Sequence, residues 1–170
     1  MSVLAETVYA PLGLYSKKIS SLDEVKDGDT IVIPDDATNG GRALLLLEKH
    51  GFIKLKDDVG QLPTKNDIET YLVDVEILEL AANNTPSSLN EVALAAINSG
   101  IATDAGLVPP EDAIVLEEAE PGNNPYINII AVRTEDKDNP IYKRIVELYQ
   151  TDAVKKIIEE DSKGASIPVW

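Results

Sequence analysis

Cysteine is absent from the 170-residue chain, and histidine occurs only once, as His50. The lack of cysteine excludes disulfide bonds, thiolate catalysis, cysteine metal sites and a lipid-attachment cysteine within these residues. His50 lies beside Gly51 at the end of an expected helix, where it can serve as a C-terminal cap. Catalytic constellations are therefore scarce and no histidine-containing metal spacing is present, so we expect a protein that is not an enzyme and needs no cofactor or metal.

Positive charge is scarce, since 15 lysines and arginines stand against 30 aspartates and glutamates, for a net charge of −15. Such a chain repels phosphate backbones and anionic lipid surfaces, so we expect no nucleic-acid partner. The acids are spread along the chain without the spacing of a calcium-binding loop, which favours a solvated surface. A carboxylate pair assembled in three dimensions, as in a hydrolase, stays a distant alternative.

Long hydrophobic runs are also missing. No apolar stretch approaches the roughly 20 residues that span a bilayer, and residues 1–4 lack the charged and apolar regions of a signal peptide. We therefore expect the chain, as given, to be soluble. With 44% apolar residues it can bury the core of a globular domain.

Segments with strand and helix patterns alternate along the chain, which predicts a layered α/β fold. Residues 7–16 are apolar but contain Pro11 and Gly13, so we expect short extended pieces. A long amphipathic helix is expected to begin at Pro140 and to break near Thr151. Residues 93–98 fit either a helix or a buried strand, and periodicity does not separate the two. The other expected strands are residues 30–33, 73–80, 113–117 and 126–133, and a polar turn is expected over 118–125.

The most informative stretch is a strand, loop and helix over residues 30–49. The loop 35–41 is rich in Asp, Thr, Asn and Gly, and an expected helix over 42–49 follows it. Backbone N–H groups at a helix start can cradle an anion, and Asn39 belongs to this loop. Arg42, in the expected first turn, is poorly placed for the helix dipole, so an anionic partner such as a ligand carboxylate would suit it.

A simpler interpretation of this stretch stays open. In it, Thr38 or Asn39 merely caps the helix, and Arg42 pairs with Asp35 or Asp36 at the surface. The loop lacks the Gly-Lys-Ser/Thr ending of a phosphate-binding Walker motif.

Two asparagines and three tyrosines are weaker candidates for a binding site. Asn98 and Asn128 lie at or near the ends of apolar runs, where a buried amide needs hydrogen-bond partners, although such residues often serve the backbone. Tyr9, Tyr15 and Tyr126 could line a pocket, although tyrosines more often pack in the core.

A run of motifs resembles the NLPA family of methionine-binding lipoproteins, which are substrate-binding components of ABC importers. The segments that carry the resemblance extend over nearly the whole chain. They are residues 13–19 (GLYSKKI), 21–28, 33–47 (IPDDATNGGRALLLL), 51–55, 88–89, 96–98 (AIN), 105–107, 125–130 (PYINII) and 163–165.

The resemblance implies an α/β fold of the type II periplasmic-binding-protein kind, with one nearly complete lobe and part of a second. The implied division is a hinge-crossing segment over 1–18, a lobe with the anion loop over 19–125, and a returning strand and helix over 126–170. The implied function is to bind L-methionine, a related amino acid or a short peptide, and to deliver it to a membrane permease. The intact family member is extracytoplasmic and lipid-anchored.

The family pattern also implies roles for individual residues. Arg42 would clamp the ligand carboxylate, while Asn98 and Asn128 would hydrogen-bond its amino and carboxylate groups. Asn39 lies in the same anion loop as Arg42, and Tyr9 lies on the segment that family members use beside the ligand.

Some features depart from the family pattern. The first strands and helices of one lobe have no counterpart before Met1, and Asp35 stands where the family usually has asparagine, which places an added acid near the carboxylate site. Residues 82–86 replace a segment that usually carries a Leu-Pro-Arg run. A second hypothesis is therefore a truncated, non-binding paralogue or fragment that acts as an interaction domain, including as a homodimer through the incomplete lobe.

Overall fold

The computed structural model describes residues 1–118 and 124–170 and divides the chain into two compact units. Unit 1 comprises Met1–Pro11 and Glu118–Trp170, and unit 2 comprises Leu12–Glu117. The expected turn over 118–125 lies mostly outside the described residues. Among the described helices, none is long and apolar enough to cross a membrane.

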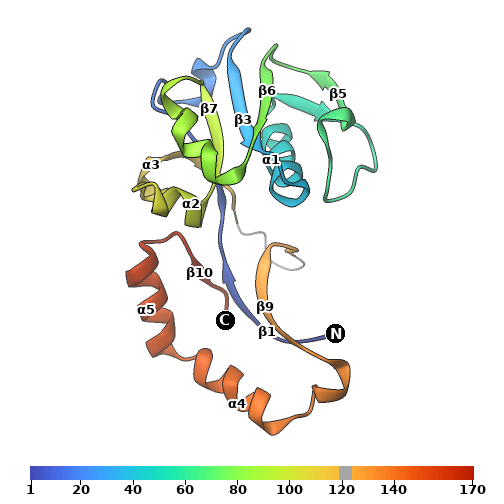
Figure 1. The fold of residues 1–170 in the computed structure, drawn as a ribbon, viewed down its shortest axis with the longest axis vertical. Helices are drawn as coiled ribbons and strands as arrows, with labels where there is room; N and C mark the ends of the chain where they lie inside the picture. The colour runs from blue at the N-terminus through green and yellow to red at the C-terminus, as the bar shows by residue number, and fades with distance from the viewer. Residues whose placement is uncertain (119–123) are drawn as a thin grey trace. The chain divides into compact units, whose positions relative to one another are not determined.

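Unit 2 is an α/β layer structure around a mixed five-stranded sheet with the order β6-β3-β7-β2-β8 (Figure 1). Strand β3 is parallel to both of its neighbours, and β2 is antiparallel to both of its own. The strands are β2 (Leu12–Tyr15), β3 (Thr30–Pro34), β6 (Glu76–Leu80), β7 (Leu94–Asn98) and β8 (Ala113–Leu116). A separate antiparallel pair is formed by β4 (Ile53–Leu55) and β5 (Ile68–Tyr71).

The helical elements of unit 2 are mostly short. They are α1 (Ala37–Lys49), α2 (Ser99–Asp104), α3 (Pro109–Asp112) and the 3₁₀ segments η1 (Leu22–Glu24), η2 (Lys65–Asp67) and η3 (Ala82–Asn90). His50 is the C-cap of α1, as expected from the sequence, while Ser21 caps η1 and Thr64 forms a capping box with η2.

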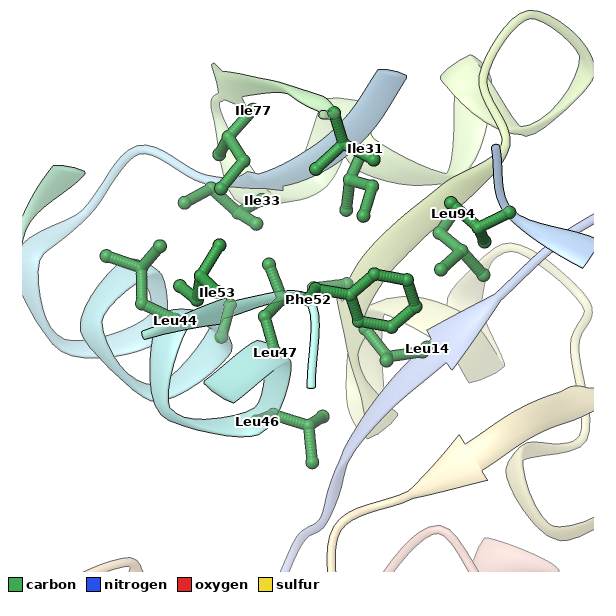
Figure 2. Close-up of a cluster of buried hydrophobic side chains, with 14 of the residues drawn as sticks. Leu14, Ile31, Ile33, Leu44, Leu46, Leu47, Phe52, Ile53, Ile77 and Leu94 are labelled. Carbon is green, nitrogen blue, oxygen red and sulfur yellow. The ribbon is translucent and has the colours of Figure 1, made fainter. Parts of the chain in front are cut away.

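The central strands of the sheet of unit 2, β2, β3 and β7, are buried on both faces, as their unbroken apolar runs require. Along β3, Ile31 and Ile33 belong to the core cluster that contains α1, whereas Val32 belongs to the cluster on the other face. Figure 2 shows Leu44 and Leu47 of α1 packed with Ile33 and their neighbours. Each fully buried side chain of this size stabilises the fold by about 1.5–3 kcal/mol. This two-sided burial explains why residues 94–98 form a strand.

Helix α1 begins five residues earlier than the sequence pattern predicts. Asp36 is its N-cap and accepts a hydrogen bond from the backbone N–H of Asn39. Residues 37–41, expected as loop, are therefore helical. As a result Arg42 lies in the second turn of the helix instead of the first, and neither Thr38 nor Asn39 is the cap.

Unit 1 contains a three-stranded antiparallel sheet with the order β10-β1-β9. Its strands are β1 (Ser2–Tyr9), β9 (Ile127–Val132) and β10 (Ile167–Pro168). Figure 1 shows β1 and β9 side by side and two successive helices, α4 (Pro140–Tyr149) and α5 (Asp152–Ser162). A 3₁₀ turn, η4 (Thr134–Asp136), precedes them. The expected start at Pro140 and the break near Thr151 are confirmed, because Thr151 caps α5.

Candidate functional site

The candidate residues of unit 2 meet at one edge of its sheet. The parallel neighbours β3 and β7 end at Pro34 and Asn98, so their carboxyl ends lie at the same edge. Strand β2 runs the other way and begins there, with Leu12 opposite Asn98. Strand β8 is antiparallel to β2, so it ends at this edge too and is followed by Glu117. Ligands of open α/β sheets bind outside the carboxyl ends of strands.

Arg42 is buried at this edge and forms an ion pair with Glu117. Its Nε lies 3.0 Å from Oε1 and 2.7 Å from Oε2 of Glu117, and its Nη2 also contacts Oε2. The two side chains are only 8% and 15% exposed. The sequence offered Asp35 and Asp36 as partners of Arg42, but the acid that faces it here comes from 75 residues further along the chain.

Glu117 also joins Arg42 to the start of β2. The backbone N–H of Leu12 donates to Glu117 Oε2 at 3.2 Å, and the N–H of Glu117 donates to the Leu12 carbonyl at 2.8 Å. One carboxylate thus receives donors from helix α1 and from the first residue of unit 2. Charge-assisted contacts of this kind are stronger than neutral hydrogen bonds.

A second series of side-chain hydrogen bonds connects the N-cap of α1 to the end of β7. The amide nitrogen of Asn39 donates to both carboxylate oxygens of Asp36, at 3.1 and 3.0 Å. The amide nitrogen of Asn98 donates in turn to Oδ1 of Asn39 at 2.8 Å. Partial burial acts to raise the pKa of Asp36, but the hydrogen bonds from Asn39 outweigh it and hold that pKa below its usual value.

The side-chain oxygen of Asn98, Oδ1, is shielded from solvent and has no hydrogen-bond partner among the described residues. Asn98 occupies the N-cap position of α2, yet its side chain makes no capping bond. A buried acceptor without a donor is uncommon in folded proteins and marks a position where a ligand donor would be favourable.

The other two candidate residues, Tyr9 and Asn128, lie in unit 1. Tyr9 is fully buried and its hydroxyl donates to the Glu118 carbonyl at 3.4 Å. Asn128 is exposed, and its amide nitrogen donates to the Val8 carbonyl at 3.3 Å. Within unit 2, then, the structure brings together Asn39, Arg42 and Asn98.

Glu117 and Asp36 also belong to the site, although the sequence pattern did not single out Glu117 and offered Asp36 only as a surface partner of Arg42. Both follow apolar strands directly or within two residues, which is the same signal that pointed to Asn98. Tyr15 packs in the core cluster on the α2 face, where burial and the nearby charge of Asp112 raise the pKa of its hydroxyl. In the part of the chain that is described, no group of three acidic or histidine side chains is placed to hold a metal ion.

Comparison with known proteins identifies relatives along the whole chain. The family model of the NlpA lipoproteins matches residues 1–170. The D-methionine-binding lipoprotein MetQ of Salmonella typhimurium is 43% identical over 169 residues, which are 98% of this chain and 61% of that protein. The chain therefore spans about three fifths of the length of this curated relative.

Solved structures share the fold. A nutrient-binding protein from Burkholderia cenocepacia, solved bound to methionine, matches with a TM-score of 0.87 and 39% identity. A periplasmic substrate-binding protein of an ABC transporter from Coxiella burnetii matches with a TM-score of 0.85, also at 39% identity. Both matches cover 99% of this chain, and they cover 70% and 69% of the respective structures. The α/β substrate-binding-protein fold expected from the sequence is thereby confirmed.

Proposed function

Because the chain belongs to the NlpA lipoprotein family, we propose that it binds methionine, a related amino acid or a short peptide as part of an ABC importer. The relatives named above are methionine-binding and ABC-transporter proteins, which supports this assignment. The proposed role is to deliver the ligand to a membrane permease, without catalysis. We also propose an extracytoplasmic location and, for the intact family member, a lipid anchor.

The observation that carries the proposal is the buried guanidinium of Arg42 at the strand edge. Two of its nitrogens donate hydrogen bonds to the carboxylate of Glu117, which is the geometry that a ligand carboxylate would use. Asn39 and Asn98 lie at the same edge, and their amides can hydrogen-bond the ligand. Asn128 and Tyr9 are proposed as further contacts contributed by unit 1.

The test is calorimetric titration of the chain with L-methionine, D-methionine, other amino acids and a methionine dipeptide, repeated on Arg42→Ala. Saturable heat that is lost in this variant supports the proposal, because a carboxylate loses its charge-assisted partner. Arg144→Ala is the matched control, since Arg144 is an exposed helical arginine that pairs with Glu147. Absence of heat across the panel at millimolar ligand would contradict methionine binding by this chain.

The division of the chain is also a proposal. We infer a crossing segment over 1–18, a ligand lobe over 19–125 and a returning segment over 126–170. The change of unit after Pro11 and after Glu117 supports two crossings of the chain.

A second candidate function is an interaction domain that forms a homodimer through unit 1. The observation that favours it is the exposure of large apolar side chains on α4 and α5, with Ile141 68%, Leu148 56% and Ile157 62% exposed. Exposed apolar faces of this kind mark association surfaces. The net charge of −15 opposes self-association, so dimerisation should strengthen as salt is added.

Analytical ultracentrifugation at low and high salt tests this candidate. Replacing Ile141 and Leu148 together with serine should abolish the dimer, whereas Leu72→Ser should not, because Leu72 is equally exposed at 59% but lies in unit 2. A monomer at every protein and salt concentration would rule the dimer out.

A further inference from the structure

The two asparagines at the sheet edge have amide orientations that their neighbours dictate. An ionised carboxylate only accepts hydrogen bonds, so the Asn39 amide must turn its NH₂ group toward Asp36. Both carboxylate oxygens of Asp36 accept a hydrogen bond from the Asn39 amide nitrogen, at 3.1 and 3.0 Å. Asp36 is itself held in place as the N-cap of α1 by the backbone N–H of Asn39.

The orientation of Asn39 fixes that of Asn98. With its NH₂ group committed to Asp36, Asn39 can offer only its oxygen to Asn98, and the NH₂ group of Asn98 donates to that oxygen at 2.8 Å. The oxygen of Asn98 is thereby turned away from Asn39. The reverse orientation of Asn98 would bring two carbonyl oxygens together, which is unfavourable.

The Asn98 oxygen, which these contacts turn away from Asn39, is a hydrogen-bond acceptor without a donor among the described residues. It is shielded from solvent, lacks a partner among residues 1–118 and 124–170, and does not cap α2. An acceptor in this position stabilises a positively charged N–H group and repels a carboxylate. In the proposed function the ligand carboxylate pairs with Arg42 at the same edge, so the two ends of an amino acid would have separate recognition groups.

We propose that Asp36 and Asn39 are positioning residues that hold the Asn98 oxygen ready for the ammonium group of the ligand. The inference rests on the proposed function and deepens it. An oriented Asn98 oxygen favours ligands with a free α-ammonium group over ligands that carry a carboxylate alone. The roles of the three residues differ. Asn98 contacts the ammonium group directly, while Asp36 and Asn39 act on that group only through Asn98.

The variant Asp36→Asn tests this chain of contacts without removing the helix cap. Asparagine caps helices as well as aspartate does, but it also carries an NH₂ group that can face the Asn39 oxygen and reverse both amides. Asp35→Asn is the matched control, because it removes the same charge from the exposed neighbouring residue. Each variant is titrated with L-methionine and with 4-(methylthio)butanoate, the analogue that lacks the amino group.

The readout is the ratio of the two dissociation constants, which cancels any general change in folding or in carboxylate binding. In Asp36→Asn the preference for L-methionine should fall about tenfold or more, as expected for a lost hydrogen bond to a charged group. In Asp35→Asn the preference should stay within about twofold of the wild-type value. An unchanged preference in Asp36→Asn, or an equal fall in both variants, overturns the inference and leaves methionine binding intact.

A second measurement separates this inference from the proposed function. The side-chain NH₂ signals of Asn39 and Asn98 are followed by ¹⁵N NMR in the protein without ligand. If wild type binds neither ligand, the proposed function fails, but displacement of the Asn98 signal in Asp36→Asn and not in Asp35→Asn still supports the orienting contacts. An Asn98 signal that stays in place in both variants overturns them.

Discussion

Arg42 and Glu117 are two charges removed from water, and each makes the burial of the other tolerable. A buried ion pair adds little net stability over an apolar pair, because desolvation offsets the attraction. Loss of one partner is different, since it leaves the other charge buried and uncompensated. The pair is therefore better understood as a way to keep a guanidinium fixed at the sheet edge than as a source of stability.

Glu117→Gln should lower the free energy of unfolding by about 3 kcal/mol, because Arg42 would keep its charge and lose its counter-ion. Urea unfolding followed by circular dichroism measures the change. Glu147→Gln is the control, since Glu147 is 61% exposed and pairs with Arg144 on a helix surface. That control should change the unfolding free energy by less than about 0.5 kcal/mol. Equal effects of the two substitutions would contradict the role given to the buried pair.

The residues that sequence reasoning found and missed differ in how far away their partners lie. Arg42 and Asn98 stand out locally, one by its place in the expected first turn of a helix and the other by ending an apolar run. Glu117 could not be assigned to Arg42 from the pattern, because the two are 75 residues apart and meet only when β8 joins the sheet. Asp36 was overlooked as the cap because residues 37–41 contain two glycines and were interpreted as loop.

Those two glycines explain how the first turns of α1 fit against the rest of unit 2. A Cβ at Gly40 would lie 2.7 Å from the carbonyl oxygen of Pro34, and a Cβ at Gly41 would lie 3.0 Å from that of Pro63. Both contacts are to backbone, which cannot move aside as a flexible side chain would. Close approach of α1 to the end of β3 is what places Asn39 beside Asn98.

Gly40→Ala should therefore destabilise the protein by about 1–3 kcal/mol, although alanine favours helices by about 1 kcal/mol over glycine. Thermal unfolding measures the effect. Gly100→Ala is the matched control, because Gly100 also lies in a helix, α2, and a Cβ there would meet no atom within 4 Å. It should leave the melting temperature unchanged or raise it. A stabilising Gly40→Ala would show that α1 can shift away from β3.

At the level of elements, the sequence predicted types better than boundaries. Proline and capping residues located the starts of α4 and α5, since their signals are local. Residues 94–98 stayed undecided because their apolar run is compatible with either element, and only pairing with β2 and β3 settles it. The segment over 82–90 forms a 3₁₀ helix that contains Pro86.

The two units differ in how deeply their helices are buried. Helix α1 of unit 2 has seven buried residues, whereas α4 and α5 of unit 1 have none. Local opening is easiest where few apolar contacts hold an element in place. The stability of the molecule is therefore uneven, with the sheet of unit 2 and α1 as its firmest part.

Hydrogen exchange measured by mass spectrometry should reflect this difference. Peptides from α4 and α5 should exchange orders of magnitude faster than peptides from α1 and β3, because their backbone bonds open without global unfolding. Slow exchange in α4 at low protein concentration would contradict this expectation. Slow exchange that appears only at high concentration would point to the dimer through unit 1.

Leu12 and Glu117 begin and end unit 2, and they hydrogen-bond each other through backbone and side chain. Adjacent ends are the geometric condition for grafting one domain into another and for circular permutation. Residues 12–117 thus have the layout of a cassette inserted into a host chain. In evolutionary terms, such a cassette can be exchanged or duplicated as one piece, with Arg42 and its ion-pair partner Glu117 inherited together.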